Sequence, residues 1–205
     1  MRNPIHELSQ ELPLASLQKI TKYLKKLAPR IGEKELAAFL ECTYPITLKP
    51  KIAFLQQGAI YYSSALVVSG VLRCFVTDNN GNDKIIQFVS ENNFVSNCES
   101  YLYQTPSQYT IEAVKQTELV VIKNNDLSLL GQQWSNLAAI GKEVTLNIVT
   151  EYKNHLILML TGSAEEKYTH LTKHKSDLIK SVPIKYLAQF LGVSRETISR
   201  LRARR

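Results

Sequence analysis

Residues 184–205 read IKYLAQFLGVSRETISRLRARR, and this stretch decides the fold of the C-terminal part of the chain. Gly192 stands where a tight turn needs a positive φ, which glycine adopts at little cost. Ala188 stands where two crossing helices leave room only for a small side chain. The apolar residues have the spacing of two packed helices: Leu187, Leu191, Val193, Ile198 and Leu201. This pattern predicts a helix-turn-helix, the motif that places its second helix in the major groove of DNA.

The second predicted helix has an inner and an outer face. Ser194 is a favourable N-cap, because its hydroxyl can accept a hydrogen bond from a free amide of the first turn. Ile198 and Leu201 are three residues apart and are expected to point inward together. The outer face then carries the residues expected to meet base edges: Ser194, Arg195, Glu196, Ser199 and Arg200.

The chemistry of this outer face suits nucleic-acid recognition. An arginine can donate two hydrogen bonds to guanine, and a glutamate can accept one from cytosine. Glu196 and Arg200 are four apart, a spacing at which an ion pair would hold Arg200 in position. Three further arginines are expected to contact phosphates, which adds affinity without sequence preference: Arg202, Arg204 and Arg205.

Two plainer interpretations of the basic end stay open. It could be an ordinary helical hairpin with a solvated basic face, or an amphipathic tail that lies on an acidic membrane surface. Neither accounts for Gly192 in the turn or for Ala188 at the helix crossing. DNA binding is therefore the preferred interpretation.

The net charge of the 205-residue chain is +7 and is unevenly distributed. Residues 1–159 hold 15 Lys and Arg against 14 Asp and Glu, whereas residues 160–205 hold 10 against 4. A neutral body with a basic end indicates a sensing or scaffolding module joined to a module that binds a polyanion.

The chain shows no secretory signal and no apolar run near the ~20 residues that span a bilayer, so we expect a cytoplasmic protein without a membrane anchor. The cysteines Cys42, Cys74 and Cys98 lie far apart and are expected to be small buried thiols. His170 and His174 are four apart, but a pair alone is a weak metal signal. We expect neither a metal nor another bound cofactor.

Helical and strand patterns alternate along the chain. Residues 14–28 and 33–41 read as helices, and short strands separated by turn formers follow from Tyr44 to about Ile122, which predicts a sandwich or barrel. The turn sequence DNNGND between VLRCFV and KIIQFV predicts a hairpin. Helices return at about Asp126 and are expected over residues 137–160 and 164–178.

An apolar row runs along the long helix of residues 137–160. Such a row is usually core, but a dimer seam would also be useful between a β module and a DNA-reading module. The row consists of Leu137, Ile140, Val144, Ile148, Tyr152, Leu156 and Leu160.

This order of elements resembles the Crp/Fnr family of bacterial transcription regulators over roughly residues 25–205. The likeness is strongest in LGVSRETISRL, which is similar to the family's DNA-reading signature. The stretch ALVVSGVLRCFVTDNNGNDKIIQFV resembles the core of the cyclic-nucleotide-binding β-roll, with Gly58 and Gly70 at matching turns. EEKYTHL is similar to the family's helix between the dimer seam and the DNA module.

The resemblance implies a fold and a mode of action. The fold class is α+β, with a cyclic-nucleotide-binding-like β-roll effector domain and flanking helices in residues 1–134, a dimerisation helix in 135–162 and a helix-turn-helix domain in 163–205. Arg195, Glu196 and Arg200 are the implied base-contacting residues. A homodimer would bind a two-fold symmetric site on double-stranded DNA, with RNA polymerase as a further partner.

One departure concerns the family's phosphate-binding cassette, a Gly-Glu pair followed further along by Arg-Ser or Arg-Thr. Ser96 and Asn97 stand at the first pair and Ser107 and Gln108 at the second, so no cation is left to meet a phosphate. Because burying an unpaired phosphate is costly, cyclic AMP is not expected to bind. Together with Tyr109 these four residues could line a neutral polar pocket, but ordinary loop residues are the preferred interpretation.

A second departure is that no β-hairpin wing follows the recognition helix in this sequence. Basic residues 202–205 could supply some of the phosphate contacts that a wing would make. An alternative function is a small-molecule-binding β-roll that docks an acidic protein partner through the basic C-terminal region. An enzyme with a barrel metal site is not expected, because residues 44–123 contain no histidine.

Overall fold

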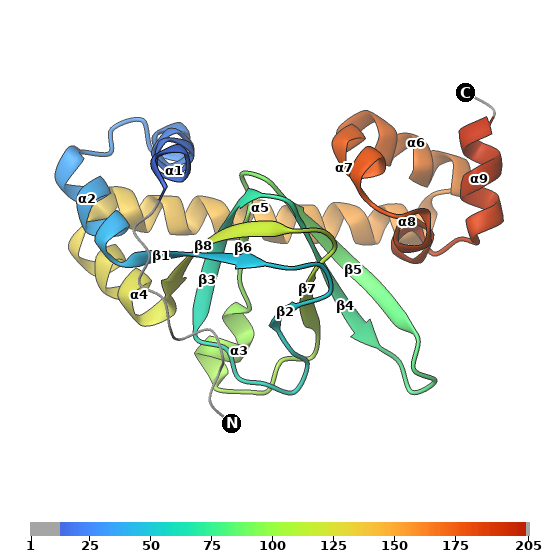
Figure 1. Cartoon of the computed structure of the whole chain (residues 1–205), viewed down its shortest axis with the longest axis horizontal. Helices are drawn as coiled ribbons and strands as arrows, with labels where there is room; N and C mark the ends of the chain where they lie inside the picture. The colour runs from blue at the N-terminus through green and yellow to red at the C-terminus, as the bar shows by residue number, and fades with distance from the viewer. Residues whose placement is uncertain (1–12, 204–205) are drawn as a thin grey trace.

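Two four-stranded antiparallel sheets form the centre of the structure, a computed structural model that describes residues 13–203. The sheets face each other as the two halves of a β-roll (Figure 1). The first sheet has the order β1 (Thr43–Leu48), β8 (Thr117–Lys123), β3 (Ser63–Ser69) and β6 (Phe94–Val95). The second has the order β2 (Ala53–Leu55), β7 (Thr110–Ala113), β4 (Val71–Thr77) and β5 (Asp83–Ser90). The predicted β-rich barrel is therefore confirmed.

The predicted hairpin is also confirmed. Strands β4 and β5 pair from Val71 opposite Ser90 to Thr77 opposite Asp83. Asp78 closes the turn, because its Oδ1 accepts hydrogen bonds from the backbone amides of Asn80 and Asn82 at 2.9 Å each. The turn sequence thus satisfies its own backbone donors, which is the usual role of Asp and Asn at such positions.

Side chains from both sheets meet inside the roll and form a closed apolar core. Strands β3 and β8 are buried on both faces, because helices cover the outer side of their sheet. These strands therefore lack the alternation of apolar and polar residues that marks a half-exposed strand. The inner core includes Leu48, Phe54, Ala65, Val67, Leu72, Val89, Ile111, Leu119 and Val121.

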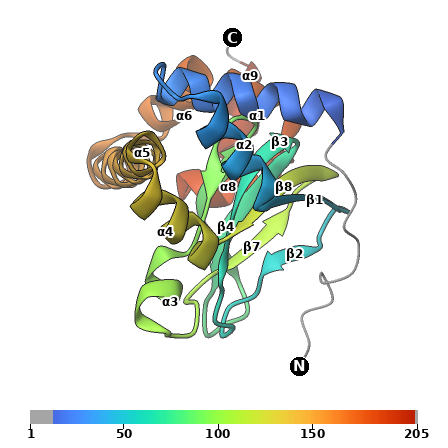
Figure 2. The ribbon, with the colours of Figure 1, turned by 90° about the vertical axis from the view of Figure 1, so that its left-hand side faces the viewer.

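Helices at one end of the roll cover this outer face (Figure 2). Helices α1 (Leu14–Leu27) and α2 (Glu33–Glu41) agree with the predicted helices, and α4 (Asn124–Gln133) follows β8. Helix α3 (Cys98–Tyr103) was not predicted and interrupts the strand region. It forms because Asn97 caps it, with the Ser100 amide donating to Asn97 Oδ1 at 3.0 Å. Cys98 is exposed at its start, so the expectation of uniformly buried thiols was wrong.

Helix α5 (Ser135–Thr161) spans the length of the molecule and joins the roll to the C-terminal helices (Figure 1). The single helix predicted for residues 164–178 is instead two, α6 (Ala164–His174) and α7 (Ser176–Ser181). The break falls at Lys175, whose φ of −139° leaves the helical region. Ser176 and Asp177 favour such a break, because both residues are better suited to a first helical turn than to a helix interior.

The apolar row predicted along α5 does not lie on one face, so that prediction was wrong. Leu137 and Ile140 are buried against the roll, but Leu156 and Leu160 are 58% and 76% exposed. The reason is geometric, since a spacing of four residues advances about 40° beyond a full turn of an α-helix. From Ile140 to Leu160 the row winds about halfway around the helix.

Gly70, between β3 and β4, provides a test of the roll's packing. Its φ is +98°, and an added Cβ would lie 2.6 Å from Thr117 Cα and 2.7 Å from the Gln116 carbonyl oxygen. Gly58 has a similar φ of +87° but open space around it, so Gly58→Ala is a matched control for backbone strain alone. We expect Gly70→Ala to lower the free energy of unfolding by about 2 kcal/mol more than Gly58→Ala does. Urea denaturation of the full chain measures the difference, and equal losses would contradict the packing.

Candidate nucleic-acid interface

The turn between α8 (Ile184–Leu191) and α9 (Arg195–Ala203) has the geometry that the sequence predicts. Gly192 ends α8 in the left-handed conformation, with φ 64° and ψ 33°. The amide of Val193 then donates to the Ala188 carbonyl at 3.0 Å. This bond satisfies a carbonyl at the helix end and turns the chain sharply towards α9.

The inner faces of the two helices pack as predicted. Ala188 is 3% exposed, which fits its expected place at a close helix crossing. The large side chains around it are also buried: Leu187, Leu191, Ile198 and Leu201. Because these residues fix how α9 is rotated about its axis, they also fix which residues α9 presents to solvent.

Helix α9 begins with the predicted cap. The amide of Thr197 donates to Ser194 Oγ at 3.1 Å, and the hydroxyls of the two residues lie 3.1 Å apart. A capped N-terminus carries a partial positive charge from its aligned peptide dipoles. The first turn of α9 is therefore suited to an anionic surface.

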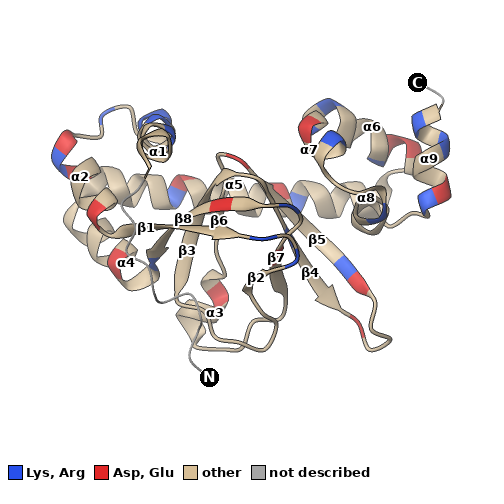
Figure 3. Ribbon diagram, in the orientation of Figure 1, with Lys and Arg blue, Asp and Glu red and all other residues tan. Residues whose placement is uncertain are grey.

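The outer face of α9 brings together four residues predicted to contact bases. Arg195, Glu196, Ser199 and Arg200 are all exposed and line one shallow hollow, with Ile184 and Ala203 at its edge. Helix α9 lies at one end of the molecule, and charged positions of both signs are visible along it (Figure 3). Ser194, also predicted, is exposed but is used as the helix cap.

The predicted ion pair between Glu196 and Arg200 is not formed among the described residues, so that expectation was wrong. Glu196 turns back to the helix start instead. Hydrogen bonds from its own backbone amide and from Ser194, with the charge of Arg195, lower the pKa of the Glu196 carboxyl. Glu196 therefore stays charged near neutral pH, and Arg200 has no acidic partner within residues 13–203.

Of the three arginines predicted to contact phosphates, Arg202 lies within the described residues. The guanidinium of Arg202 donates from Nη2 to the Ile179 carbonyl at 3.0 Å, so it ties α9 to the end of α7. Arg202 is still exposed and keeps further donors for solvent or a ligand. Arg204 and Arg205 lie outside the described residues.

A buried arginine that the sequence reasoning missed fixes the position of α8 on the roll. Arg73, on β4, is 5% exposed and forms ion pairs with Asp83 and Glu112 at 2.9 Å each. Its guanidinium carbon lies 3.9 Å from the ring centre of Phe75 and 4.4 Å from that of Tyr186 on α8. The signal was present in the sequence, since Arg73 is the one charge inside the apolar strand VLRCFV.

A second aromatic contact lies beside the first. Phe190 on α8 packs edge-on against Phe88 on β5, with ring centres 5.1 Å apart. The imidazole of His155 on α5 stacks on Phe190 at 4.2 Å with an interplanar angle of 6°. Helix α8 is thus held between a strand of the roll and the long helix, and the direction of α9 depends on both.

The residues predicted to line an effector pocket mainly bond to one another. Asn97 is 3% exposed and donates from Nδ2 to Ser107 Oγ at 2.8 Å, and Ser107, 4% exposed, donates to the Tyr109 carbonyl at 2.6 Å. The Ser64 hydroxyl donates to Ser96 Oγ at 2.8 Å, and Gln108 is exposed. These polar groups support the loop around α3.

Residues 13–203 contain no helix that is both long and apolar enough to cross a membrane. The same residues contain no group of three or more His, Cys, Asp and Glu side chains placed to hold a metal ion. His170 and His174 lie on one face of α6 with ring centres 4.5 Å apart.

Residues 45–133 match the model of the cyclic nucleotide-binding domain. In this structure the matched segment contains all of α3, β2 to β8 and α4 and most of β1. None of the curated proteins matches the sequence.

Solved structures with a similar fold include regulators of the Crp/Fnr family. FixK2 from Bradyrhizobium japonicum is 16% identical, with a TM-score of 0.70 over 79% of this chain and 83% of its own. A crp/fnr-family regulator from Eubacterium rectale is 17% identical, with a TM-score of 0.65 over 85% and 83%. The Thermus thermophilus catabolite activator protein is 21% identical, with a TM-score of 0.54 over 86% and 84%. These likenesses extend beyond the matched residues 45–133 to most of the chain.

Proposed function

We propose that this chain is a sequence-specific, dimeric DNA-binding transcription regulator of the Crp/Fnr type that acts in the cytoplasm and does not depend on cyclic AMP. The observation that carries the proposal is the outer face of α9. Arg195, Glu196, Ser199 and Arg200 lie together on a helix whose inner face is fully packed and whose N-terminus is capped. A rigid helix with this exposed face suits insertion into a major groove.

The residues on this face have complementary roles in reading DNA. Arg195 and Arg200 can each donate two hydrogen bonds to the O6 and N7 of a guanine, and Glu196 can accept from a cytosine amino group. The hydroxyl of Ser199 adds a donor or acceptor of little selectivity. Arg202, at the edge, is suited to a phosphate, which adds affinity without sequence preference.

A solvent-facing seam on α5 supports the proposed homodimer. Large apolar side chains there are more than half exposed: Leu146, Val149, Leu156, Ile157 and Leu160. The spacing alternates between three and four residues along positions 146, 149, 153, 156 and 160, of which position 153 is a lysine. This is the spacing of a two-stranded coiled coil. Pairing with a second copy of α5 would remove this seam from water.

A two-fold dimer of this kind would present two copies of α9. Such dimers read inverted half-sites whose centres lie about one helical turn, 34–36 Å, apart. By likeness to the regulators of similar fold, we include RNA polymerase as a partner of the DNA-bound dimer. No catalytic role is part of the proposal.

Independence from cyclic AMP rests on the missing cation of the cassette. Residues 96–109 contain no Lys or Arg, and Asn97 and Ser107 are hydrogen-bonded to each other. Arg73 is a cation of the same domain, but Asp83 and Glu112 already neutralise it. A cyclic phosphate placed in the roll would therefore lack the charged partner that a buried anion requires.

Selection of duplexes from a random pool by the purified full chain, at near-physiological salt, tests the proposal. We expect an inverted repeat with half-sites about one helical turn apart, recovered equally well with and without cyclic AMP. Binding without a consensus, which disappears as salt rises, would reveal charge attraction alone and would contradict sequence-specific reading. In that case an acidic protein partner becomes the better candidate for the basic C-terminal region.

A further inference from the structure

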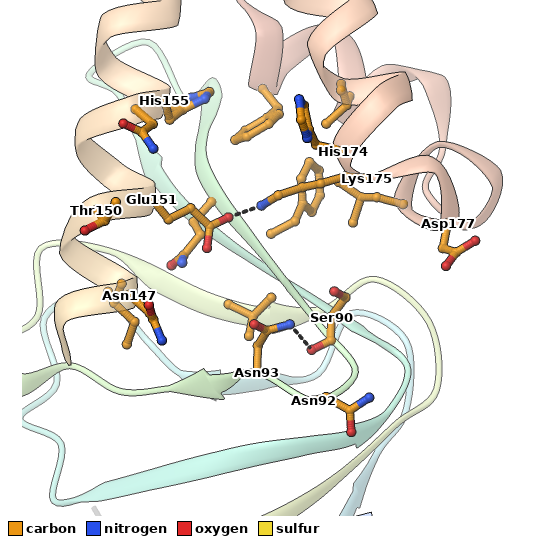
Figure 4. Close-up of a pocket in the computed structure, with 18 of the residues that line it drawn as sticks. Ser90, Asn92, Asn93, Asn147, Thr150, Glu151, His155, His174, Lys175 and Asp177 are labelled. Carbon is orange, nitrogen blue, oxygen red and sulfur yellow. Dashed lines mark hydrogen bonds and ion pairs between the residues drawn. The ribbon is translucent and has the colours of Figure 1, made fainter. Parts of the chain in front are cut away.

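A cavity of about 640 Å³ lies between α5, the end of β5 and the helices α6 and α7 (Figure 4). This volume is within the range of pockets that hold small organic ligands. The lining of the cavity comes from α1, α5 and β5 and from the C-terminal helices α6, α7 and α8. None of the effector-pocket residues predicted from the sequence lines it.

The wall formed by α6 and α7 is basic. Lys167, His170 and His174 share one face of α6, and Lys175 follows at the junction with α7. Burial lowers the pKa of His155 on the opposite wall, and the positive charges of His170 and Lys167 lower it further. Burial is the larger cause of this shift, and the smaller contribution from the neighbouring bases is the part that a bound anion would offset.

Few acidic groups oppose this charge. Glu151 on α5 and Asp177 on α7 are the carboxylates among the described residues that line the cavity. Glu151 pairs with Lys175 across the cavity, whereas Asp177 stands apart from that pair (Figure 4). Glu151 therefore occupies the position on Lys175 that an anionic ligand would take.

The lining also includes apolar and neutral polar side chains. Phe88, Leu158 and Phe190 contribute apolar surface. Asn93 and Asn147 supply hydrogen-bonding groups (Figure 4). The cavity thus combines basic groups with aromatic and aliphatic side chains. A ligand complementary to both kinds of group is a small organic anion, a phosphate ester or a carboxylate, that carries an aromatic ring.

We propose that this interdomain cavity is a binding site for a small aromatic phosphate ester or carboxylate, held by Lys175 and the basic face of α6. The ligand displaces Glu151 from Lys175 and places its ring against Phe88 and Phe190. Because Phe88, His155 and Phe190 also hold α8 on the roll, occupancy changes the position of the helix-turn-helix. This last consequence rests on the proposed DNA-binding function, whereas the binding site does not.

Phenyl phosphate is the probe that tests the site, with inorganic phosphate and phenol as its charged and apolar halves. Each is titrated into the full chain without DNA, and the imidazole resonances of His155, His170 and His174 are followed by NMR. We expect these resonances to shift and phenyl phosphate to bind at least about tenfold more tightly than either half. Binding no tighter than that of inorganic phosphate would overturn the proposal.

Two variants of the same ion pair should act in opposite directions. Lys175→Met removes the ligand's main partner and should weaken phenyl phosphate binding about tenfold or more. Glu151→Gln frees Lys175 from its internal partner and should tighten binding about threefold or more. A merely structural role predicts that both variants weaken binding alike, because each loses the same ion pair, and that result would overturn the assignment.

Lys180→Met is the matched control, because Lys180 lies on α7, is exposed and does not line the cavity. Its binding should stay within about twofold of the unmodified chain. Saturating phenyl phosphate should also change the affinity for the selected duplex in the unmodified chain but not in Lys175→Met. Probe binding is measured without DNA, so the two proposals can fail separately. A failed duplex selection would contradict the proposed function, whereas failed probe binding would contradict the cavity proposal.

Discussion

Replacing Arg195 and Arg200 together by alanine is expected to lower affinity for the selected duplex about a hundredfold or more, because each bidentate arginine–guanine contact contributes about 1–3 kcal/mol. Both side chains are exposed, so the free energy of unfolding should change by less than about 0.5 kcal/mol. Affinity for an unrelated duplex should fall far less, because phosphate contacts survive. Fluorescence anisotropy with the two duplexes measures both effects.

Arg202→Ala is the control for this pair. It removes a charge from the same helix but from a side chain that donates to the Ile179 carbonyl rather than lining the outer hollow. We expect it to weaken binding to the selected and unrelated duplexes by the same factor and to reduce the salt dependence. If Arg202→Ala altered sequence preference while the double variant did not, the proposed orientation of α9 in the groove would be wrong.

Leu156→Glu is expected to separate the proposed dimer into monomers at micromolar concentration. Two-fold symmetry places the introduced carboxylate on both copies of the seam. Each dimer interface would then contain two buried negative charges that repel each other. The dissociation constant should rise about a hundredfold or more. Sedimentation equilibrium measures it, and affinity for an inverted repeat should fall in parallel, because two linked half-sites bind far better than one.

Leu129→Glu is the matched control for the seam. Leu129 is 62% exposed, but it lies on α4 rather than α5. The Leu129→Glu substitution introduces the same charge at a site of similar exposure outside the seam. It should leave the sedimentation behaviour unchanged. If the Leu156→Glu variant sedimented like the unmodified chain, α5 would not be the dimer interface.

The turn between α8 and α9 was predictable from sequence because its constraints are local. Gly192 needs a positive φ, Ala188 needs a small side chain, and Ser194 needs a nearby amide, all within a few residues of one another. The β4–β5 hairpin was predictable for the same reason, since Asp78 satisfies the turn that it begins. Each of these residues acts on its immediate neighbours in the chain.

The features that the sequence did not reveal depend on distant partners. The partners of Arg73 include Tyr186, more than a hundred residues further along the chain, so no local pattern joins them. Residues on two faces of α5 were predicted to form one apolar row, because side chains four residues apart are evenly spaced in the sequence. On the helix, that spacing winds around the axis. Likewise, Lys175 and Glu151 are brought together only when α6 folds back along α5.

The contact between α8 and the roll has a further consequence for how the protein can be divided. Val71, Phe75, Ile85 and Phe88 of β4 and β5 belong to one continuous apolar core with residues of the helix-turn-helix. A fragment cut after α5 would expose this strand surface to water and would be prone to aggregate. Exchanging the C-terminal module with that of another protein of similar fold would likewise require the matching strand residues to be transplanted with it.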